Sequence, residues 1–207
     1  MEVARTDRSG LTNAAILDTA LAMARAEGLE SLTIGEVAKR LGLSKSGVFS
    51  RVGSREALQI AVIEEYDRRF LQAVFTPAMR EPRGRARLDA LMRLWLDYIR
   101  ADDGQGCLYV AGAFEYDDRE GEVRERLLDG VTRWRQALRR AVQQAIDSGD
   151  FAADTDAAQL AFEIDALITG VMRDTRFIRD PQAPMRAWRA WQRLADGASA
   201  APPVPHR

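Results

Sequence analysis

The sequence is poor in the side chains from which catalytic and metal sites are usually built. Its 207 residues include one cysteine, Cys107, and one histidine, His206. With so few thiol and imidazole groups, we expect no metal site, no cofactor, and no Ser-His or Cys-His catalytic pair. A single cysteine also forms no internal disulfide, which is typical of a reducing compartment. We interpret Cys107 as a buried small apolar residue, with a redox sensor as the alternative.

Long apolar runs and alternating patterns are also missing. No run of about 18 apolar residues is present to span a bilayer. The first residues lack the apolar core of a secretory signal, so we expect a cytoplasmic protein with no membrane partner. Apolar residues recur at helical spacing, and no period-two pattern indicates a strand. With 46% hydrophobic residues, the sequence predicts an all-α protein with one small and one medium core.

Acidic residues are absent from one stretch of a chain whose overall charge is balanced. The chain has 30 basic and 31 acidic residues, yet none of the acidic ones lies between Ala38 and Arg55. The basic residues of this stretch are Lys39, Arg40, Lys45, Arg51 and Arg55. A local cationic patch in a near-neutral protein is typical of a surface that follows DNA phosphates. A solvated face whose acidic partners lie elsewhere is the alternative.

The same stretch has the boundary signals of two short helices and a tight turn. Thr33 and Glu36 form a capping box that starts the first helix. Gly42 supplies the left-handed residue that ends it, and Ser44 is placed to cap the second helix. Two short helices joined by a glycine-containing turn predict a helix-turn-helix, whose second helix enters the major groove of DNA.

The second helix of this pair has an apolar side and a polar side. We expect Val48, Phe49 and Val52 to point inward and the polar residues to point outward. The exposed face and the N-terminal end of such a helix approach base edges, and flanking residues hold phosphates. The residues expected near base edges are Lys45, Ser46, Gly47 and Ser50. Those expected at phosphates are Thr33, Arg51 and Arg55.

Residues 15–58, AILDTALAMARAEGLESLTIGEVAKRLGLSKSGVFSRVGSREAL, resemble the DNA-binding domain of the TetR (tetracycline repressor) family. The resemblance implies a long first helix, a helix-turn-helix, and a following helix that leads into a ligand domain. The family usually has Tyr where Phe49 stands, and its hydroxyl often bonds a phosphate. It commonly has His-Phe where this chain has Arg51 and Val52. We therefore count Phe49 among the DNA-binding residues without the hydroxyl contact.

The rest of the chain predicts further helices. A first helix from Thr12 ends at Gly28, and a long helix after residue 54 ends before Pro77. Apolar stripes predict later helices over 88–99, 108–116, 123–146, 155–178 and 184–194. The predicted domains are a flexible arm (1–10), a helix-turn-helix domain (11–56), a ligand-binding and dimerisation domain (57–197), and a disordered tail (198–207).

The predicted helix 156–177 has a second apolar stripe in addition to its core stripe. Phe162, Ala166 and Gly170 recur every four residues, and small residues at such spacing let another backbone approach closely. A helix that is central in its own domain would also show two stripes. TetR-like proteins dimerise through their last two major helices, so the resemblance favours a homodimer seam completed by Trp188 and Trp191. Two-fold symmetry fits a palindromic operator.

Aromatic residues accumulate in the second predicted domain, as in an apolar ligand site. The candidate ligand-binding residues are Tyr66, Phe70, Trp95, Tyr98, Phe114 and Trp134. A plain aromatic core is the alternative. The acidic cluster Glu115, Asp117 and Asp118 is interpreted as a solvated helix end rather than as a site for a cationic ligand.

Two classes of function follow from these features. The first is a ligand-responsive transcriptional regulator, most consistent with a repressor, whose partners are double-stranded operator DNA, a second copy and a small-molecule effector of unknown identity. The alternative is a small all-helical enzyme that acts on an acidic or aromatic small molecule. The chain has lone acids and one thiol rather than a paired acid/base set, so the regulator is favoured over the enzyme.

Overall fold

The computed structural model describes the backbone of residues 3–101 and 106–200 and the side chains of residues 13–100 and 106–200. Over these ranges the protein is helical and contains no strand; Phe151 and Ser199 form an isolated antiparallel bridge. The all-α prediction is therefore confirmed. Among the described helices, none combines the length and the apolar character that crossing a bilayer requires.

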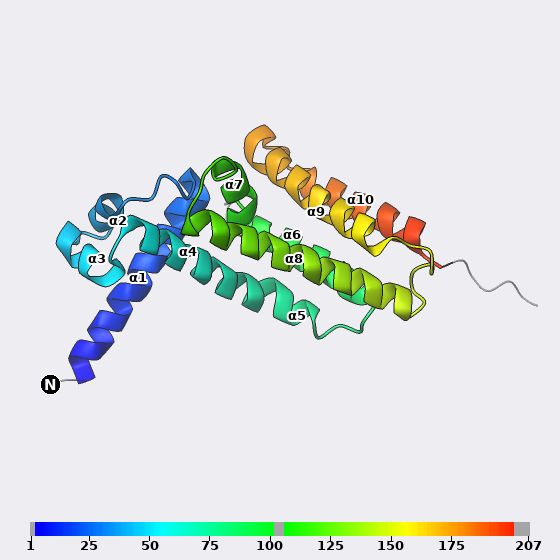
Figure 1. The fold of residues 1–207 in the computed structure, drawn as a ribbon, viewed down its shortest axis with the longest axis horizontal. Coiled ribbons are helices and arrows are strands. Elements are labelled where there is room, and N and C mark those ends of the chain that lie inside the picture. Colours follow the sequence, from blue (N-terminus) through cyan, green and yellow to red (C-terminus); the bar gives the residue numbers. More distant parts are fainter. Residues whose placement is uncertain (1–2, 102–105, 201–207) are drawn as a thin grey trace, which may run out of the picture. The chain divides into compact units, whose positions relative to one another are not determined.

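The helices form two compact units (Figure 1). Of the described residues, the first unit comprises 3–69 and 106–130, and the second comprises 70–101 and 131–200. The boundary predicted between residues 56 and 57 separates a DNA-binding domain from a ligand-binding and dimerisation domain. This division by function stays a prediction.

The first unit contains the predicted helix-turn-helix. It is built from α1 (Val3–Glu27), α2 (Ile34–Arg40), α3 (Lys45–Val52), nearly all of α4 (Arg55–Phe70), α7 (Leu108–Glu115), and the first turns of α8 (Glu122–Asp147). Helix α2 packs against both α1 and α3. Apolar residues of α1 to α4 and of the loop after α1 form the buried core: Ile16, Ala20, Leu21, Leu29, Leu32, Val37, Val48, Leu58 and Val62.

The boundaries of α2 and α3 are those predicted from the sequence. The hydroxyl of Thr33 accepts the backbone N–H of Glu36 at 3.1 Å. Gly42 follows α2 with a φ of 63°, in the left-handed region. The hydroxyl of Ser44 then accepts the backbone N–H of Gly47 at 3.0 Å, which starts α3. Both caps satisfy amides that the first turn of a helix leaves without partners.

Helix α1 begins earlier than predicted. It starts at Val3, so the backbone of residues 3–10, predicted to be a flexible arm, is helical. This segment contains no proline, and each residue added to an existing helix gains one backbone hydrogen bond. The predicted start at Thr12 rests on the helical periodicity of apolar residues. A helix can extend beyond that periodic segment, because its backbone bonds do not depend on it.

The helical path after residue 54 also continues further than predicted. Helix α4 passes through a π-helical turn, η1 (Leu71–Phe75), into the short helix α5 (Thr76–Ala78), so the predicted end before Pro77 is wrong. Across the π turn, the N–H of Thr76 donates to the carbonyl of Leu71. Pro77 then lies in the first turn of α5, where a missing N–H is tolerated.

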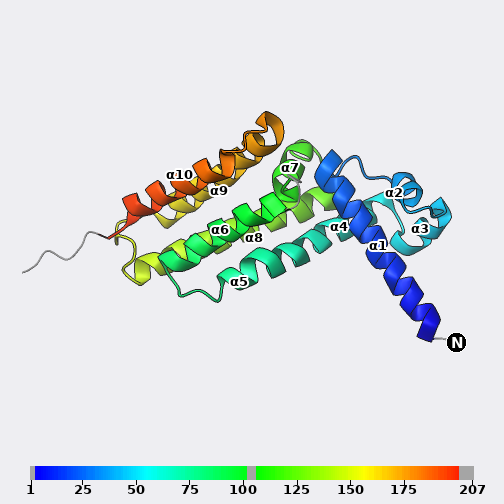
Figure 2. The ribbon, with the colours of Figure 1, turned by 180° about the vertical axis from the view of Figure 1, so that it is seen from behind.

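The second unit is a bundle of long helices. It contains α6 (Arg85–Ala101), the remainder of α8, α9 (Ala157–Arg173), a π-helical turn η2 (Asp174–Ile178), and α10 (Ala183–Ala198). Helices α9 and α10 lie side by side, and α10 also packs against α6 (Figure 2). Their inward faces form a buried core that includes Leu88, Leu91, Met92, Trp95, Leu138, Val142, Ile164, Ile168 and Trp191.

The start of the predicted disordered tail is ordered. The N–H of Ala152 donates to the carbonyl of Ala198 at 2.8 Å, and the N–H of Ala200 donates to the carbonyl of Asp150 at 3.2 Å. These bonds join the end of α10 to the loop before α9. Residues 201–207 of the predicted tail, which include His206, lie outside the described residues.

Candidate nucleic-acid interface

Helix α3 presents the polar face expected of a DNA-reading helix. Val48 is fully buried beneath it, whereas Lys45, Ser46, Ser50 and Arg51 are exposed. Phe49 is 55% exposed, so the prediction that it points inward is wrong. The helix has only 8 residues, and Val48 is its buried one. Phe49 follows Val48 directly, so it lies on the side of the helix rather than beneath it. An exposed ring beside the polar face agrees with a place for Phe49 at the interface.

The polar residues of α3 are held close to the helix backbone. The Ser50 hydroxyl and Nη1 of Arg51 both donate to the carbonyl of Gly47, at 3.0 and 2.8 Å. A guanidinium has five N–H groups, so Arg51 can bond a phosphate while keeping this contact. A Cβ on Gly47 would lie 2.9 Å from Oγ of Ser44. The glycine therefore leaves room for the cap that starts α3.

The charges of the cationic patch fall into two groups. Lys39 pairs with Glu36 at 4.0 Å, and Arg40 forms an ion pair with Glu27. Lys45 and Arg51 are instead exposed on α3, and Arg51 keeps a bond to the backbone carbonyl of Gly47. The positive potential of the patch is therefore concentrated on the reading helix, at the surface where a phosphate backbone would pass.

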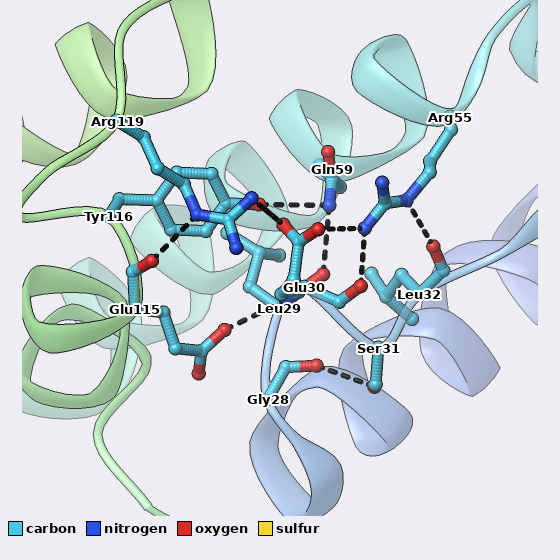
Figure 3. A network of polar contacts seen from close by, with 10 residues as sticks. All are labelled: Gly28, Leu29, Glu30, Ser31, Leu32, Arg55, Gln59, Glu115, Tyr116 and Arg119. Atoms are coloured by element: carbon cyan, nitrogen blue, oxygen red, sulfur yellow. Dashed lines mark hydrogen bonds and ion pairs between the residues drawn. The ribbon is translucent and has the colours of Figure 1, made fainter.

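Arg55, which is predicted to hold a phosphate, contacts the loop before α2 in the structure. Its Nε donates to the carbonyl of Leu32 at 2.8 Å, and its Nη2 contacts both the carbonyl of Glu30 and, at 2.8 Å, the Glu30 carboxylate. These contacts tie the first residue of α4 to the loop before α2 (Figure 3). They join residues more than 20 positions apart, so no local pattern in the sequence indicates them.

The acidic cluster after α7 is only partly a solvated helix end. Asp117 and Asp118 are exposed, in agreement with the prediction. Glu115 is half-buried and accepts the backbone N–H of Glu30 at 2.9 Å. Cys107, at the start of α7, is buried as predicted, and its burial raises the pKa of the thiol. A protonated, buried thiol lacks the thiolate character of a redox sensor.

The six aromatic residues predicted to bind a ligand do not form one set. Within the second unit, the ring of Phe70 meets those of Tyr98 and Trp134 edge to face, with centroids 6.1 and 5.4 Å apart. Trp95 is 2% exposed in the core of the same unit.

The other two aromatic residues belong to the first unit. Tyr66 is buried and packs against Tyr109, with ring centroids 5.7 Å apart. Phe114 is 68% exposed on α7, which does not support a role in an enclosed site.

A small cavity lies among core residues of the second unit. It has a volume of about 10 Å³ and is lined by residues that include Met92, Trp134 and Trp191. Ligand pockets for small molecules usually span about 300–1,000 Å³. This part of the core therefore has to open before it can accept an effector.

The predicted dimer seam is split between a groove and the core. Phe162, Ala166 and Gly170 line an open groove of about 560 Å³ between α9 and α10. Trp188 lies elsewhere on α10, with the guanidinium of Arg93 5.9 Å from its ring centroid. Trp191 is fully buried, and its Nε1 donates to Asp89 at 2.7 Å. Because the side chain of Trp191 has no exposed surface, it makes no direct contact with a partner subunit. It can support the predicted seam only by packing beneath it.

An exposed, cationic reading helix within a helix-turn-helix defines a DNA-binding protein. Two family models match the chain: "Bacterial regulatory proteins, tetR family" over residues 16–62, and "Tetracyclin repressor-like, C-terminal domain" over residues 84–191. Together they cover most of the sequence. The chain belongs to the TetR family and is a transcriptional regulator.

Solved structures share the fold. A TetR-family regulator from Chloroflexus aurantiacus matches with a TM-score of 0.80 at 22% identity, over 92% of this chain and 95% of that one. One from Cytophaga hutchinsonii matches with a TM-score of 0.77 at 18% identity, over 94% and 98%. A transcriptional regulator from Saccharomonospora viridis, in complex with choline, matches with a TM-score of 0.78 at 19% identity, over 93% and 100%. A comparison with curated proteins finds no match.

Proposed function

We propose that this regulator is a cytoplasmic repressor that binds a palindromic operator as a homodimer and is released by a small-molecule effector. The observation that carries the proposal is the exposed face of α3, where Lys45, Ser46, Ser50 and Arg51 surround a glycine and no acidic side chain intervenes. Lys45, Ser46, Gly47 and Ser50 approach base edges, Phe49 packs beside them, and Thr33 and Arg51 bond phosphates.

The groove between α9 and α10 supports the homodimer. Its floor is apolar or small, and its rim carries both signs of charge: Glu163, Asp174, Arg186 and Arg193. A two-fold interface places the same patch on both subunits, so a rim with both signs can pair with a copy of itself. Phe162, 55% exposed at the edge of this groove, supplies an aromatic anchor of the kind enriched in interfaces.

The aromatic cluster of Phe70, Tyr98 and Trp134 is the proposed place of effector entry. Its edge-to-face rings offer an apolar or aromatic molecule similar contacts once the cluster opens. A neighbour with this fold holds choline, which supports a small-molecule effector as such. The effector has to bind the released form more tightly than the DNA-bound form, and coupling of about 1–3 kcal/mol is typical of such linkage.

Selection of DNA from a random pool by the purified full-length protein tests the proposal. We expect a two-fold symmetric sequence with half-sites about 34 Å apart or a multiple of that distance. Affinity for the selected site falls steeply with salt, because each neutralised phosphate releases counterions. The double variant Lys45→Ala/Arg51→Ala is the negative control. It should keep the helical circular dichroism of the wild type and should no longer enrich a DNA sequence from the pool. Recovery of no preferred sequence, or an affinity that does not change with salt, would contradict the proposal.

A further inference from the structure

A network of polar contacts fastens the loop between α1 and α2 to the end of α7 (Figure 3). The backbone N–H of Glu30 donates to Oε2 of Glu115, and the hydroxyl of Tyr116 donates to Oε2 of Glu30, both at 2.9 Å. The approach is close, because a Cβ on Gly28 would lie 2.7 Å from Oε1 of Glu115. Gly28 also has a φ of 95°, which favours glycine at this position.

The same loop is fastened to the start of α4. Besides the bonds of Arg55 to Leu32 and Glu30, Nε2 of Gln59 donates to the carbonyl of Leu29 at 2.9 Å. It also lies 3.0 Å from the hydroxyl oxygen of Tyr116, which accepts its second N–H. Side chains of α4 thus satisfy three carbonyls of the loop, and Tyr116 bonds both the loop and α4.

These bonds lie at the two ends of the helix-turn-helix segment. The chain enters the helix-turn-helix through loop 28–32 and leaves it at Arg55, so the network holds both ends of the DNA-reading segment together. Tyr116 then joins them to α7, which lies within the part of the chain matched by the C-terminal family model. We call the side chains of Glu30, Arg55, Gln59, Glu115, Tyr116 and Arg119, with the backbone of 28–32, the 28–32 network.

Burial and charge favour a persistent network. Gln59 is 4% exposed and Tyr116 is 6% exposed, and buried polar groups that lose a partner are costly. Arg119 pairs with the Glu30 carboxylate at 3.1 Å, and its guanidinium lies 5.2 Å from the centroid of the Tyr116 ring. The hydrogen bond from Arg55 lowers the pKa of Glu30, and burial raises the pKa of Tyr116. At neutral pH, Glu30 is therefore an acceptor and Tyr116 a donor.

We propose that Glu30, Arg55, Gln59 and Tyr116 are positioning residues for operator binding, which fix the helix-turn-helix on α7 without touching DNA. The inference rests on the proposed function, since it presupposes an operator. It gives Arg55 a role different from a phosphate contact. The two roles differ in their effect on salt dependence, because a residue that touches no phosphate releases no counterion.

Glu30→Gln is the most informative variant, because electrostatics and positioning predict opposite signs. Removal of a negative charge from a DNA-binding domain strengthens binding to DNA through the long-range field. Loss of the charge-assisted bonds to Arg55, Tyr116 and Arg119 loosens the reading segment and weakens binding. We expect operator affinity about tenfold lower, the size of one charge-assisted hydrogen bond. Glu64→Gln, which removes a carboxylate paired with Arg126 at 2.7 Å, is the matched control and should bind as tightly as the wild type or more tightly.

Tyr116→Phe removes only the hydroxyl and keeps the ring, so it decides the question if Glu30→Gln does not fold. We expect it to weaken operator binding severalfold, with circular dichroism unchanged. The double variant should be less impaired than the product of the two single effects, because both substitutions remove the same Tyr116–Glu30 bond.

Arg55→Ala separates positioning from phosphate contact. Operator affinity should fall while the slope of log affinity against log salt stays at the wild-type value. Arg51→Ala, at a residue assigned to a phosphate, provides the comparison with a direct phosphate contact. If the slope for Arg55→Ala falls by about one, the change expected for one lost phosphate contact, Arg55 is not a positioning residue.

The failure of this inference is distinct from failure of the proposed function. If the wild type selects no DNA sequence, the proposed function fails. If the wild type binds its operator and folded Glu30→Gln or Tyr116→Phe binds equally well or more tightly, the 28–32 network is structural and the inference is overturned.

Discussion

Some residues at the start of α3 build the helix, whereas others are exposed on its surface and are available to DNA. Ser44 and Gly47 build the start of α3, since the hydroxyl of one accepts the N–H of the other at 3.0 Å. Lys45 has no such task and extends outward from the first turn of the helix. The proposed base recognition by Lys45 therefore uses a side chain that the fold itself does not require.

Lys45→Ala should change which operator variants are preferred. A lost base contact costs about 1–3 kcal/mol at the base pair that it reads and little at others. Lys39→Ala removes the same charge from α2, where Lys39 is 78% exposed beside Glu36, and should affect all operator variants alike. Binding measured against a set of single-base operator variants gives both profiles. Identical profiles for the two substitutions would show that Lys45 contacts the backbone rather than a base.

At the scale of elements, a charged cluster joins α1 to α4. Glu65 accepts bonds from Arg68 at 2.6 and 2.7 Å and from Arg69 at 2.7 Å, and Arg69 also pairs with Asp18 of α1. The side chain of Glu65 is 12% exposed. The hydrogen bonds, above all those from Arg68, lower the pKa of Glu65 to about 2. Folding therefore favours the ionised carboxylate.

This cluster should stabilise the protein in a pH-dependent manner. A carboxylate whose pKa is lower in the folded than in the unfolded state contributes fully above the unfolded value, and the contribution is lost as pH falls through the folded value. Glu65→Gln should cost about 1 kcal/mol at pH 7, since Arg68 is largely exposed and the pairs are screened. The difference from wild type should shrink as pH falls from about 4.5 toward about 2.

Thermal unfolding of the two proteins across this pH range measures the effect. Glu56→Gln, an exposed carboxylate of the same helix, controls for net charge. A stability difference between wild type and Glu65→Gln that is constant with pH would show that the lost packing of the side chain, not its charge, is responsible.

The sequence predicts elements well where their ends are set by neighbouring residues. Thr33, Gly42 and Ser44 act within four positions of themselves, so the helix-turn-helix could be placed from local chemistry alone. The continuation of the helix through Pro77 is not indicated by the sequence, because a π turn just before it changes the hydrogen-bond pattern that a proline would otherwise interrupt. The burial of Trp191 and the bond from Tyr116 to Glu30 depend on segments 102 and 86 residues apart. No spacing within one helix contains that information.

At the scale of the whole molecule, the proposed homodimer depends on one helix having two faces. The predicted core stripe of α9 is buried at Leu160, Ile164, Ile168 and Val171. Leu167, predicted in the same stripe, is half-buried and lines the groove. Ala166 and Gly170 line the groove that α9 shares with α10. Such a face on a monomer would remain open to water, whereas in a dimer it brings two backbones together.

Gly170→Leu should weaken the dimer and leave the subunit folded. A Cβ on Gly170 meets nothing within 4 Å in the structure, and exchange of Gly for Leu inside a helix favours the helix by about 0.8–1 kcal/mol. Any loss is therefore an effect on the partner, whose backbone the new side chain holds away. Gly197→Leu is a matched control, because Gly197 lies in α10 outside the groove and also has open space around it.

Sedimentation over a range of concentrations gives the dimer affinity of each variant, and operator binding gives its consequence. We expect Gly170→Leu to dissociate at concentrations where the wild type and Gly197→Leu remain dimeric. Its operator affinity should fall in parallel, because a single subunit contacts only half of a palindrome and the second contact no longer benefits from the first. An intact Gly170→Leu dimer would place the subunit interface away from this groove. Loss of the dimer with unchanged operator affinity would instead show that one subunit suffices for binding, and that the operator is not read as a palindrome.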